Sequence, residues 1–165
     1  MTKAKQAFMP RHDDRSKLAR EIRYEADALQ YSYQATLHPA PSPLDCLLLE
    51  AFLVHWRNLW YFFLEPRHRQ DVIASDYISS WNPPKPHSDL RDRIHVTLAH
   101  ISTARIGAKP LTAEEVRVMR DHVAGLWVEF DRALRSDERS WFHDNPLKHK
   151  FPAEYRGPKS PLSGC

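Results

Sequence analysis

Apolar residues recur every three or four positions along four stretches of the chain, which is the spacing of amphipathic α-helices. The pattern predicts helices at about residues 14–37, 44–64, 88–107 and 112–134, and a shorter helical element at about 71–77. Prolines fall between these stretches, where they suit loops and the first turns of helices. Thr112-Ala-Glu-Glu115 has the pattern of a capping box and marks the start of the last long helix.

Four long helices joined by short connections predict an all-α fold. We expect an antiparallel bundle of four helices, or of five if a shorter element also becomes an α-helix. The bundle domain is expected over residues 14–140. A flexible segment over residues 1–13 would precede it, and a Pro-rich, poorly ordered tail over residues 141–165 would follow.

The second predicted helix carries apolar side chains on more than one face. Leu47 and Val54 extend the apolar surface to one side, and Trp56 and Trp60 extend it to the other. A helix with one face in water needs only one apolar stripe. The helix is therefore either central to the bundle or buried by a second copy of the chain, and we favour a homodimer.

Three polar residues, His55, Arg57 and Asn58, lie close together among the apolar residues of this helix. His55 and Asn58 fall near the face that points inward, and a buried imidazole or amide without a partner costs about 1–3 kcal/mol. Either they bind each other or nearby backbone, or they contact a substrate. Arg57 falls to the other side, where aromatic rings can stack on it or a partner subunit can face it.

The third predicted helix carries a second polar pair. Arg93 and His100 are seven residues apart, so helical spacing places them within about 20° of each other, beside the apolar stripe. Thr97 lies between them and is small enough to leave space, while Arg105 lies one turn beyond His100. His95 points elsewhere and is expected to be a solvated surface residue.

A histidine and an arginine at one cleft can cleave RNA without a metal ion. The imidazole transfers a proton to or from a ribose or leaving oxygen, and the guanidinium stabilises charge on the phosphoryl oxygens. The sequence contains no His-Glu-x-x-His pattern, paired-cysteine metal site or Gly-rich phosphate loop. We therefore expect neither a metal nor a cofactor at the position of Arg93 and His100.

Composition places the chain among ordinary soluble proteins. Of its 165 residues, 42% are hydrophobic and 27% are charged. No apolar stretch is long enough for a membrane span, and the first residues lack the apolar segment of a secretory signal. The two cysteines, Cys46 and Cys165, suit a reducing compartment, so we expect a cytoplasmic protein. The net charge of +3 neither requires nor excludes RNA as a partner.

An all-helical bundle in which Arg is followed by His at this spacing resembles the HEPN superfamily. The matching segment is Arg93-Ile-His-Val-Thr-Leu-Ala-His100, and the resemblance covers about residues 44–105. It implies a homodimer in which Arg93 and His100 of both subunits converge and cleave RNA without a metal. It also implies a role in toxin–antitoxin or antiviral defence, with an antitoxin or a nucleotidyltransferase as a partner protein.

Two other interpretations remain open. The first is a non-catalytic dimeric helical module that binds a nucleotide, RNA or a protein partner. In this case the buried polar residues would specify the packing or bind the ligand. Beside the catalytic pair, the candidate residues for binding the substrate or supporting the pair are His55, Arg57, Asn58, Thr97 and Arg105. The second is purely structural, with Arg93 and His100 bound to carboxylates such as Glu50 or Asp89.

Overall fold

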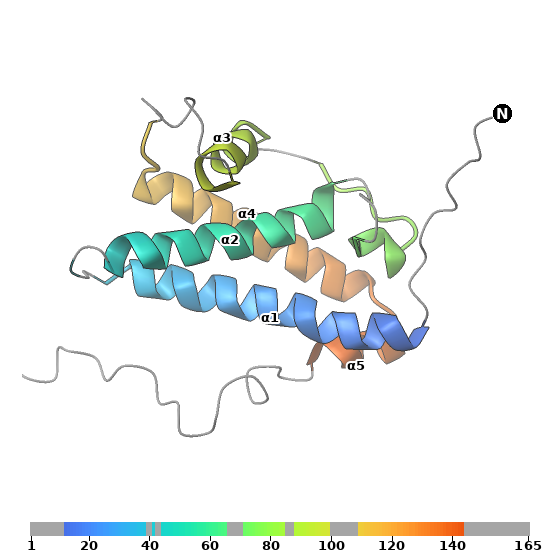
Figure 1. Cartoon of the computed structure of the whole chain (residues 1–165). Helices are drawn as coiled ribbons and strands as arrows, with labels where there is room; N and C mark the ends of the chain where they lie inside the picture. Colours follow the sequence, from blue (N-terminus) through green and yellow to red (C-terminus); the bar gives the residue numbers. More distant parts are fainter. Residues whose placement is uncertain are drawn as a thin grey trace, which may run out of the picture.

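The computed structural model describes residues 12–38, 41, 44–65, 71–84, 88–99 and 109–143, and every regular element in these ranges is helical. The elements are α1 (His12–Thr36), α2 (Leu44–Leu64), the 3-10 helix η1 (Ala74–Asp76), α3 (Ser88–Ala99), α4 (Ala113–Ala133) and α5 (Ser136–His143) (Figure 1). The predicted all-α helical fold is therefore confirmed, with five α-helices.

The long helix α2 lies in the middle of the bundle because its apolar side chains point in several directions. It contacts α1, α3 and α4, and eight of its residues between positions 52 and 64 are buried. Trp56 and Trp60 are among the largest fully buried side chains. The indole N–H of Trp56 donates to the carbonyl oxygen of Met119 on α4 at 3.1 Å, so the ring is buried without losing its hydrogen bond. A central position thus explains the apolar composition of this part of α2.

The first two helices run antiparallel along their length (Figure 1). Tyr33, near the end of α1, contacts Phe52 of α2 with ring centroids 6.0 Å apart. Glu25, earlier in α1, contacts His55, which lies later in α2. This pairing is the most extensive contact between two elements in the described structure. It fixes which residues of α1 can reach the polar positions of α2.

The chain between α2 and α3 is held against the core by aromatic packing. Trp81 packs on the rings of Phe63 and Phe130, at centroid distances of 5.8 and 5.6 Å. Its indole N–H donates to the carbonyl oxygen of Phe63 at 2.8 Å. The following helix, α3, contacts α2, and its Leu90 and Ile94 are buried in the core. The packing of Trp81 and of α3 therefore fixes where the side chains of α3 lie relative to α2.

The short helix α5 packs against α1 and crosses the expected domain boundary at residue 140. Phe142 is only 1% exposed and Trp141 packs half-buried against the core, so both belong to the helical domain rather than to a tail. Glu138 is also buried, and its carboxylate lies 3.6 Å from the guanidinium of Arg15 on α1.

The helix boundaries agree closely with the apolar pattern where the structure describes them. α2 begins and ends at the predicted residues, and α1 begins two residues before its predicted start. Thr112 is the N-cap of α4, and both hydrogen bonds of its capping box with Glu115 are present. The predicted third helix continues to residue 107, but residues 100–108 lie outside the described part. So do residues 1–11 and 144–165, which the predicted terminal segments include.

Among the described helices, none combines the length and the apolar character that crossing a bilayer requires.

Candidate functional site

Arg93 reaches from α3 to the N-terminal end of α4, where it binds Glu115. Its Nη1 donates to Oε1 of Glu115 at 3.1 Å, and its Nη2 lies 3.1 Å from Oε2, which makes a two-point ion pair. The backbone N–H of Thr112 donates to the same carboxylate at 2.7 Å. The hydrogen bonds from Arg93 and Thr112 hold the pKa of Glu115 down at about 2. Arg93 is therefore a half-buried cation in a fixed position.

The structure describes less of the other residues that were predicted to act with Arg93. His100 and Arg105 lie outside the described residues. Thr97 belongs to α3, but only its backbone is described. The pairing of Arg93 with His100 therefore stays a prediction. The carboxylate that binds Arg93 is Glu115, whereas Glu50 and Asp89 had been considered for this contact.

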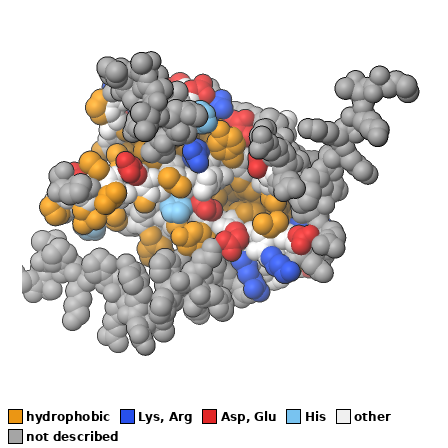
Figure 2. Space-filling model, viewed as in Figure 1, with side chains coloured by type: hydrophobic (Ala, Val, Ile, Leu, Met, Phe, Trp, Pro, Cys, Tyr) orange, Lys and Arg blue, Asp and Glu red, His pale blue; other side chains and the backbone are white. Residues whose placement is uncertain are grey.

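A second group of polar side chains lies between α1 and α2. Oε2 of Glu25 is 2.7 Å from Nδ1 of His55 and accepts a hydrogen bond from Nδ2 of Asn58 at 3.1 Å. The ring of Tyr24 contacts the His55 ring edge-on, with centroids 5.8 Å apart. Figure 2 shows a histidine beside an acidic side chain at the centre of the face that α1 and α2 form. The carboxylate of Glu25 on the neighbouring helix thus binds both polar residues, a partner that differs from those considered from the sequence, which were each other, nearby backbone or a substrate.

A cleft of about 460 Å³ opens beside the C-terminal half of α2. Its walls come from α2, α3 and the segment before η1: Arg57, Asn58, Tyr61, Phe62, Asp71, Val72, Ile73 and His95. The lining combines apolar side chains with a guanidinium, an imidazole, a phenol, an amide and a carboxylate. Small-molecule sites in proteins are typically concave regions of this size with a few polar groups among apolar walls.

Two polar groups of this cleft have no partner among the residues that the structure describes. Within the described part of the chain, the guanidinium of Arg57 and the hydroxyl of Tyr61 take part in no hydrogen bond or ion pair. The two residues are four positions apart on α2, so they lie one above the other on the same side of the helix. Asp71 and His95 differ from them, because each takes part in a further contact.

His95 is half-buried and lines the cleft, which corrects the prediction that it is a solvated surface residue. On α3 it lies two positions after Arg93, and therefore about 200° around the helix. The buried Ile94 lies between them and faces the core. His95 and Arg93 thus lie on opposite flanks of α3. The partial burial of His95 comes from the packing of α3 beside α2 and residues 71–73, which the pattern of a single helix does not reveal.

The structure brings some of the predicted residues together and keeps others apart. Arg57 and Asn58 line the same cleft, and Asn58 shares the carboxylate of Glu25 with His55. Arg93 belongs to neither group, because its guanidinium is held by Glu115 on the far flank of α3.

The sequence analysis did not identify Glu25, Tyr61 and Asp71 as site residues. The sequence carries an indication for the first two of them and none for the third. Glu25 directly precedes Ala26, which belongs to the apolar face of the first helix. A carboxylate beside an apolar face indicates a residue that needs a polar partner on a neighbouring helix. Tyr61 follows Arg57 at helical spacing, which also indicates a shared face. Asp71 lies in an irregular segment whose position depends on tertiary packing, and nothing local identifies it.

Comparison with known proteins adds no assignment: no family model, no curated protein and no solved structure matches this chain, so the resemblance to HEPN proteins stays a prediction.

Proposed function

We propose that this chain is a HEPN-like, metal-independent endoribonuclease in which Arg93 and His100 perform the chemistry. The observation that supports the proposal is the fixed guanidinium of Arg93, which Glu115 holds half-buried on α3. Position 100 directly follows the last residue of α3, and helical spacing predicts that His100 shares the flank of Arg93. An arginine that is already oriented loses little freedom when it binds a phosphoryl group.

The proposed reaction is a transesterification within the RNA strand. A neutral imidazole of His100 takes the proton of a ribose 2′-hydroxyl, and the 2′-oxygen attacks the adjacent phosphorus. The bond from phosphorus to the 5′-oxygen of the next nucleotide breaks, and that oxygen takes up a proton from the His100 imidazolium formed in the first step, which returns the imidazole to its neutral form. The products are a 2′,3′-cyclic phosphate and a 5′-hydroxyl end. Arg93 stabilises the negative charge that builds up on the phosphoryl oxygens.

A homodimer is part of this proposal, because two copies of α3 would supply two catalytic pairs. It is supported by the N-terminal half of α2, where Leu44, Leu47 and Val54 are 47%, 57% and 40% exposed. Figure 2 shows hydrophobic side chains gathered over this end of α2. We also propose a cytoplasmic role in toxin–antitoxin or antiviral defence, with an antitoxin or nucleotidyltransferase as the partner protein.

A second candidate function is a non-catalytic module that binds a nucleotide, RNA or protein. One observation favours it: the charge of Arg93 is matched by Glu115, while the guanidinium of Arg57, which no described residue pairs, lines a cleft elsewhere. Under this alternative, α3 contributes to binding and packing but not to proton transfer.

The test is cleavage of total RNA by the purified protein in the presence of EDTA. We expect wild type to produce fragments with 2′,3′-cyclic phosphate ends, and His100→Ala to lose at least about a hundredfold in rate. His38→Ala, which changes an exposed histidine after α1, should cleave like wild type. Equal cleavage by His100→Ala would refute the assignment of the catalytic pair. A folded wild type that binds RNA but leaves it intact would favour the non-catalytic module.

A further inference from the structure

We infer that the cleft beside α2 binds a nucleoside monophosphate, with the phosphate held by Arg57. This site is separate from the proposed Arg93 and His100 pair, since it lies on the opposite flank of α3. The inference therefore does not depend on the proposed ribonuclease activity.

The electrostatics of the cleft favour an anionic group next to Arg57. The guanidinium of Arg57 is half-buried, and within the described residues no carboxylate or carbonyl binds it. Most arginines of the described structure that are half-buried have such a partner, and Arg93 with Glu115 and Arg91 with Glu65 are examples. Asp71 also lines the cleft, but it is exposed and takes part in a further contact. A phosphate dianion matches a guanidinium in charge and in its capacity for two parallel hydrogen bonds.

The walls of the cleft favour a ligand in which a planar, uncharged ring system is attached to the anionic group. Phe62, Val72 and Ile73 present apolar surface, and the phenol ring of Tyr61 lies on the same helical face as Arg57. The volume of about 460 Å³ lies within the range of pockets that hold a small organic ligand, and exceeds the space that inorganic phosphate needs. A nucleobase satisfies both conditions, because its faces are apolar and its outline is planar.

The remaining polar groups match the edges of a nucleoside. Asn58 donates to Glu25 through Nδ2, which fixes the amide and turns its Oδ1 away from that carboxylate. Oδ1 of Asn58 and the carboxylate of Asp71 accept hydrogen bonds from ribose hydroxyls or base N–H groups, and the hydroxyl of Tyr61 donates or accepts. This chemistry is common to a free nucleotide and to one residue of an RNA strand.

The test is a titration of the full chain with uridine and adenosine 5′-monophosphate, followed by calorimetry and by NMR shifts of backbone amides. We expect saturable binding, with a shift of the amides of residues 57–62 and 71–73. Arg57→Met should weaken the binding at least about tenfold, because it removes a charged hydrogen-bond donor. Arg132→Met is the matched control, because Arg132 is an exposed arginine of α4 outside the cleft, and it should bind like wild type.

Two further ligands test which parts of the nucleotide the cleft recognises. Uridine and inorganic phosphate each lack one half of the proposed ligand, so each should bind at least about tenfold more weakly than uridine monophosphate. A single-stranded oligonucleotide that competes for the site would identify an RNA residue as the natural ligand. Absence of competition would identify a free nucleotide. Both results keep the inference.

Three outcomes would overturn it: no saturable binding of either nucleotide, equal affinity for inorganic phosphate, or unchanged binding by Arg57→Met. Within the described residues the Arg57 guanidinium takes part in no hydrogen bond or ion pair, and methionine keeps an apolar stem of similar length, so the variant should unfold close to the wild-type temperature, which circular dichroism verifies. The titration is repeated with His100→Ala, which should bind the nucleotide like wild type because position 100 is not among the described residues that line the cleft. Nucleotide binding by a wild-type protein that cleaves no RNA would refute the proposed enzyme and leave this inference intact.

Discussion

Three polar residues near the middle of α2, His55, Arg57 and Asn58, illustrate how differently one helix can accommodate side chains that do not fit an apolar surface. His55 and Asn58 face α1 and share the carboxylate of Glu25. Arg57 faces the cleft and has no protein partner in the described structure. The first arrangement is complete without a ligand, because each buried donor has an acceptor. The second is complete only with water or an anion, which makes Arg57 the stronger candidate for binding.

The hydrogen bonds of Glu25 with His55 and Asn58 should stabilise the fold, and Glu25→Ala measures this contribution. The substitution leaves half-buried His55 and Asn58 without their shared acceptor, so we expect the free energy of unfolding to fall by about 1–3 kcal/mol. Glu129→Ala removes an exposed carboxylate of α4 and should change it by less than about 0.5 kcal/mol. Urea denaturation gives both values. A loss no larger for Glu25→Ala than for the control would show that water replaces the carboxylate fully.

The ion pair of Glu115 with Arg93 predicts a specific dependence of stability on pH. The pKa of Glu115 in the fold is about 2, below its ordinary value of 4.5. Its ionised form therefore stabilises the fold fully above about pH 4.5, and this stabilisation is lost as the pH falls through about 2. Glu115→Gln removes the titrating group.

The difference in melting temperature between wild type and Glu115→Gln should thus be largest above pH 4.5 and should shrink towards pH 2. Thermal unfolding followed by circular dichroism between pH 2 and pH 6 measures it. Arg93→Gln should reduce the same pH dependence, because the hydrogen bond from Arg93 is the main cause of the low pKa. A difference that stays constant with pH would contradict the pairing.

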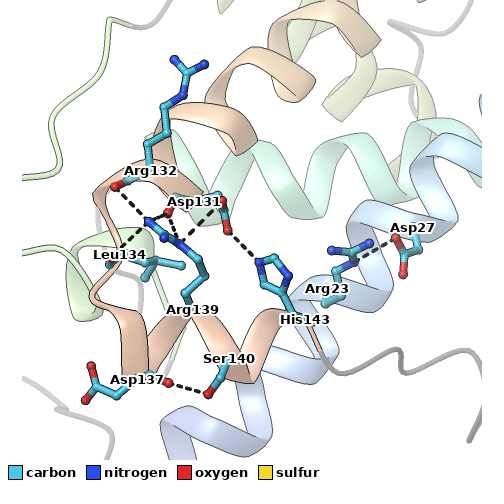
Figure 3. A network of polar contacts seen from close by, with 9 residues as sticks. All are labelled: Arg23, Asp27, Asp131, Arg132, Leu134, Asp137, Arg139, Ser140 and His143. Carbon is cyan, nitrogen blue, oxygen red and sulfur yellow. Dashed lines mark hydrogen bonds and ion pairs between the residues drawn. The ribbon is translucent and has the colours of Figure 1, made fainter.

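At the scale of the elements, α4 is capped at both ends by side chains. Thr112 and Glu115 form the capping box at its start. At its end, the guanidinium of Arg139 on α5 donates to the carbonyl oxygens of Asp131, Arg132 and Leu134, at distances from 2.7 to 3.3 Å (Figure 3). The last carbonyls of a helix have no partner within the helix, and a cation suits the negative end of its dipole. Arg139 therefore joins α5 to α4 through the backbone.

Removal of this cap should loosen α5. We expect Arg139→Met to lower the free energy of unfolding by about 1–2 kcal/mol and to speed hydrogen exchange in α5 and in the last turn of α4. Arg132→Met is the matched control, since the Arg132 side chain points away from the network in Figure 3. Mass spectrometry of exchanged peptides measures the effect. Similar exchange in both variants would show that the packing of Phe142 alone holds α5 in place.

The elements differ in how well sequence predicts them, for reasons that lie in their stabilisation. α2 is specified by its own apolar residues and by the prolines before and after it, and both its ends were predicted. α5 has eight residues, of which few are apolar, and it depends on Arg139 and on the burial of Phe142 and Glu138. These contacts come from α1, from α4 and from Tyr77 after η1, so the local pattern did not indicate a helix.

The candidate sites also combine features that the local sequence specifies with features that depend on tertiary contacts. His55, Asn58 and Arg57 stood out because a polar residue in an apolar helix is visible in the sequence itself. Their partners were not visible, because the contact with Glu25 depends on the register between α1 and α2. The partial burial of His95 likewise depends on how α3 packs beside α2. Sequence thus identifies residues that need a partner, and tertiary packing decides which partner they find.

For the molecule as a whole, the central position of α2 explains only part of its apolar surface. Residues 52–64 supply the buried core, but Leu44, Leu47 and Val54 stay exposed on the outer side. Helical spacing places Leu47 and Val54 on one face, together with Glu50 between them. Three exposed aliphatic side chains along one helix form a surface that a second copy of the chain can cover.

A homodimer through this surface predicts that Leu47→Glu raises the dimer dissociation constant at least about tenfold, because a charge would enter an apolar contact. Val128→Glu is the control, since Val128 is also an exposed aliphatic residue but lies on α4. Sedimentation velocity at micromolar concentration distinguishes the two. Wild type and Val128→Glu should sediment as dimers and Leu47→Glu as a monomer. A monomeric wild type would exclude convergence of two copies of Arg93 and His100, so any RNA cleavage would then have to come from one chain alone.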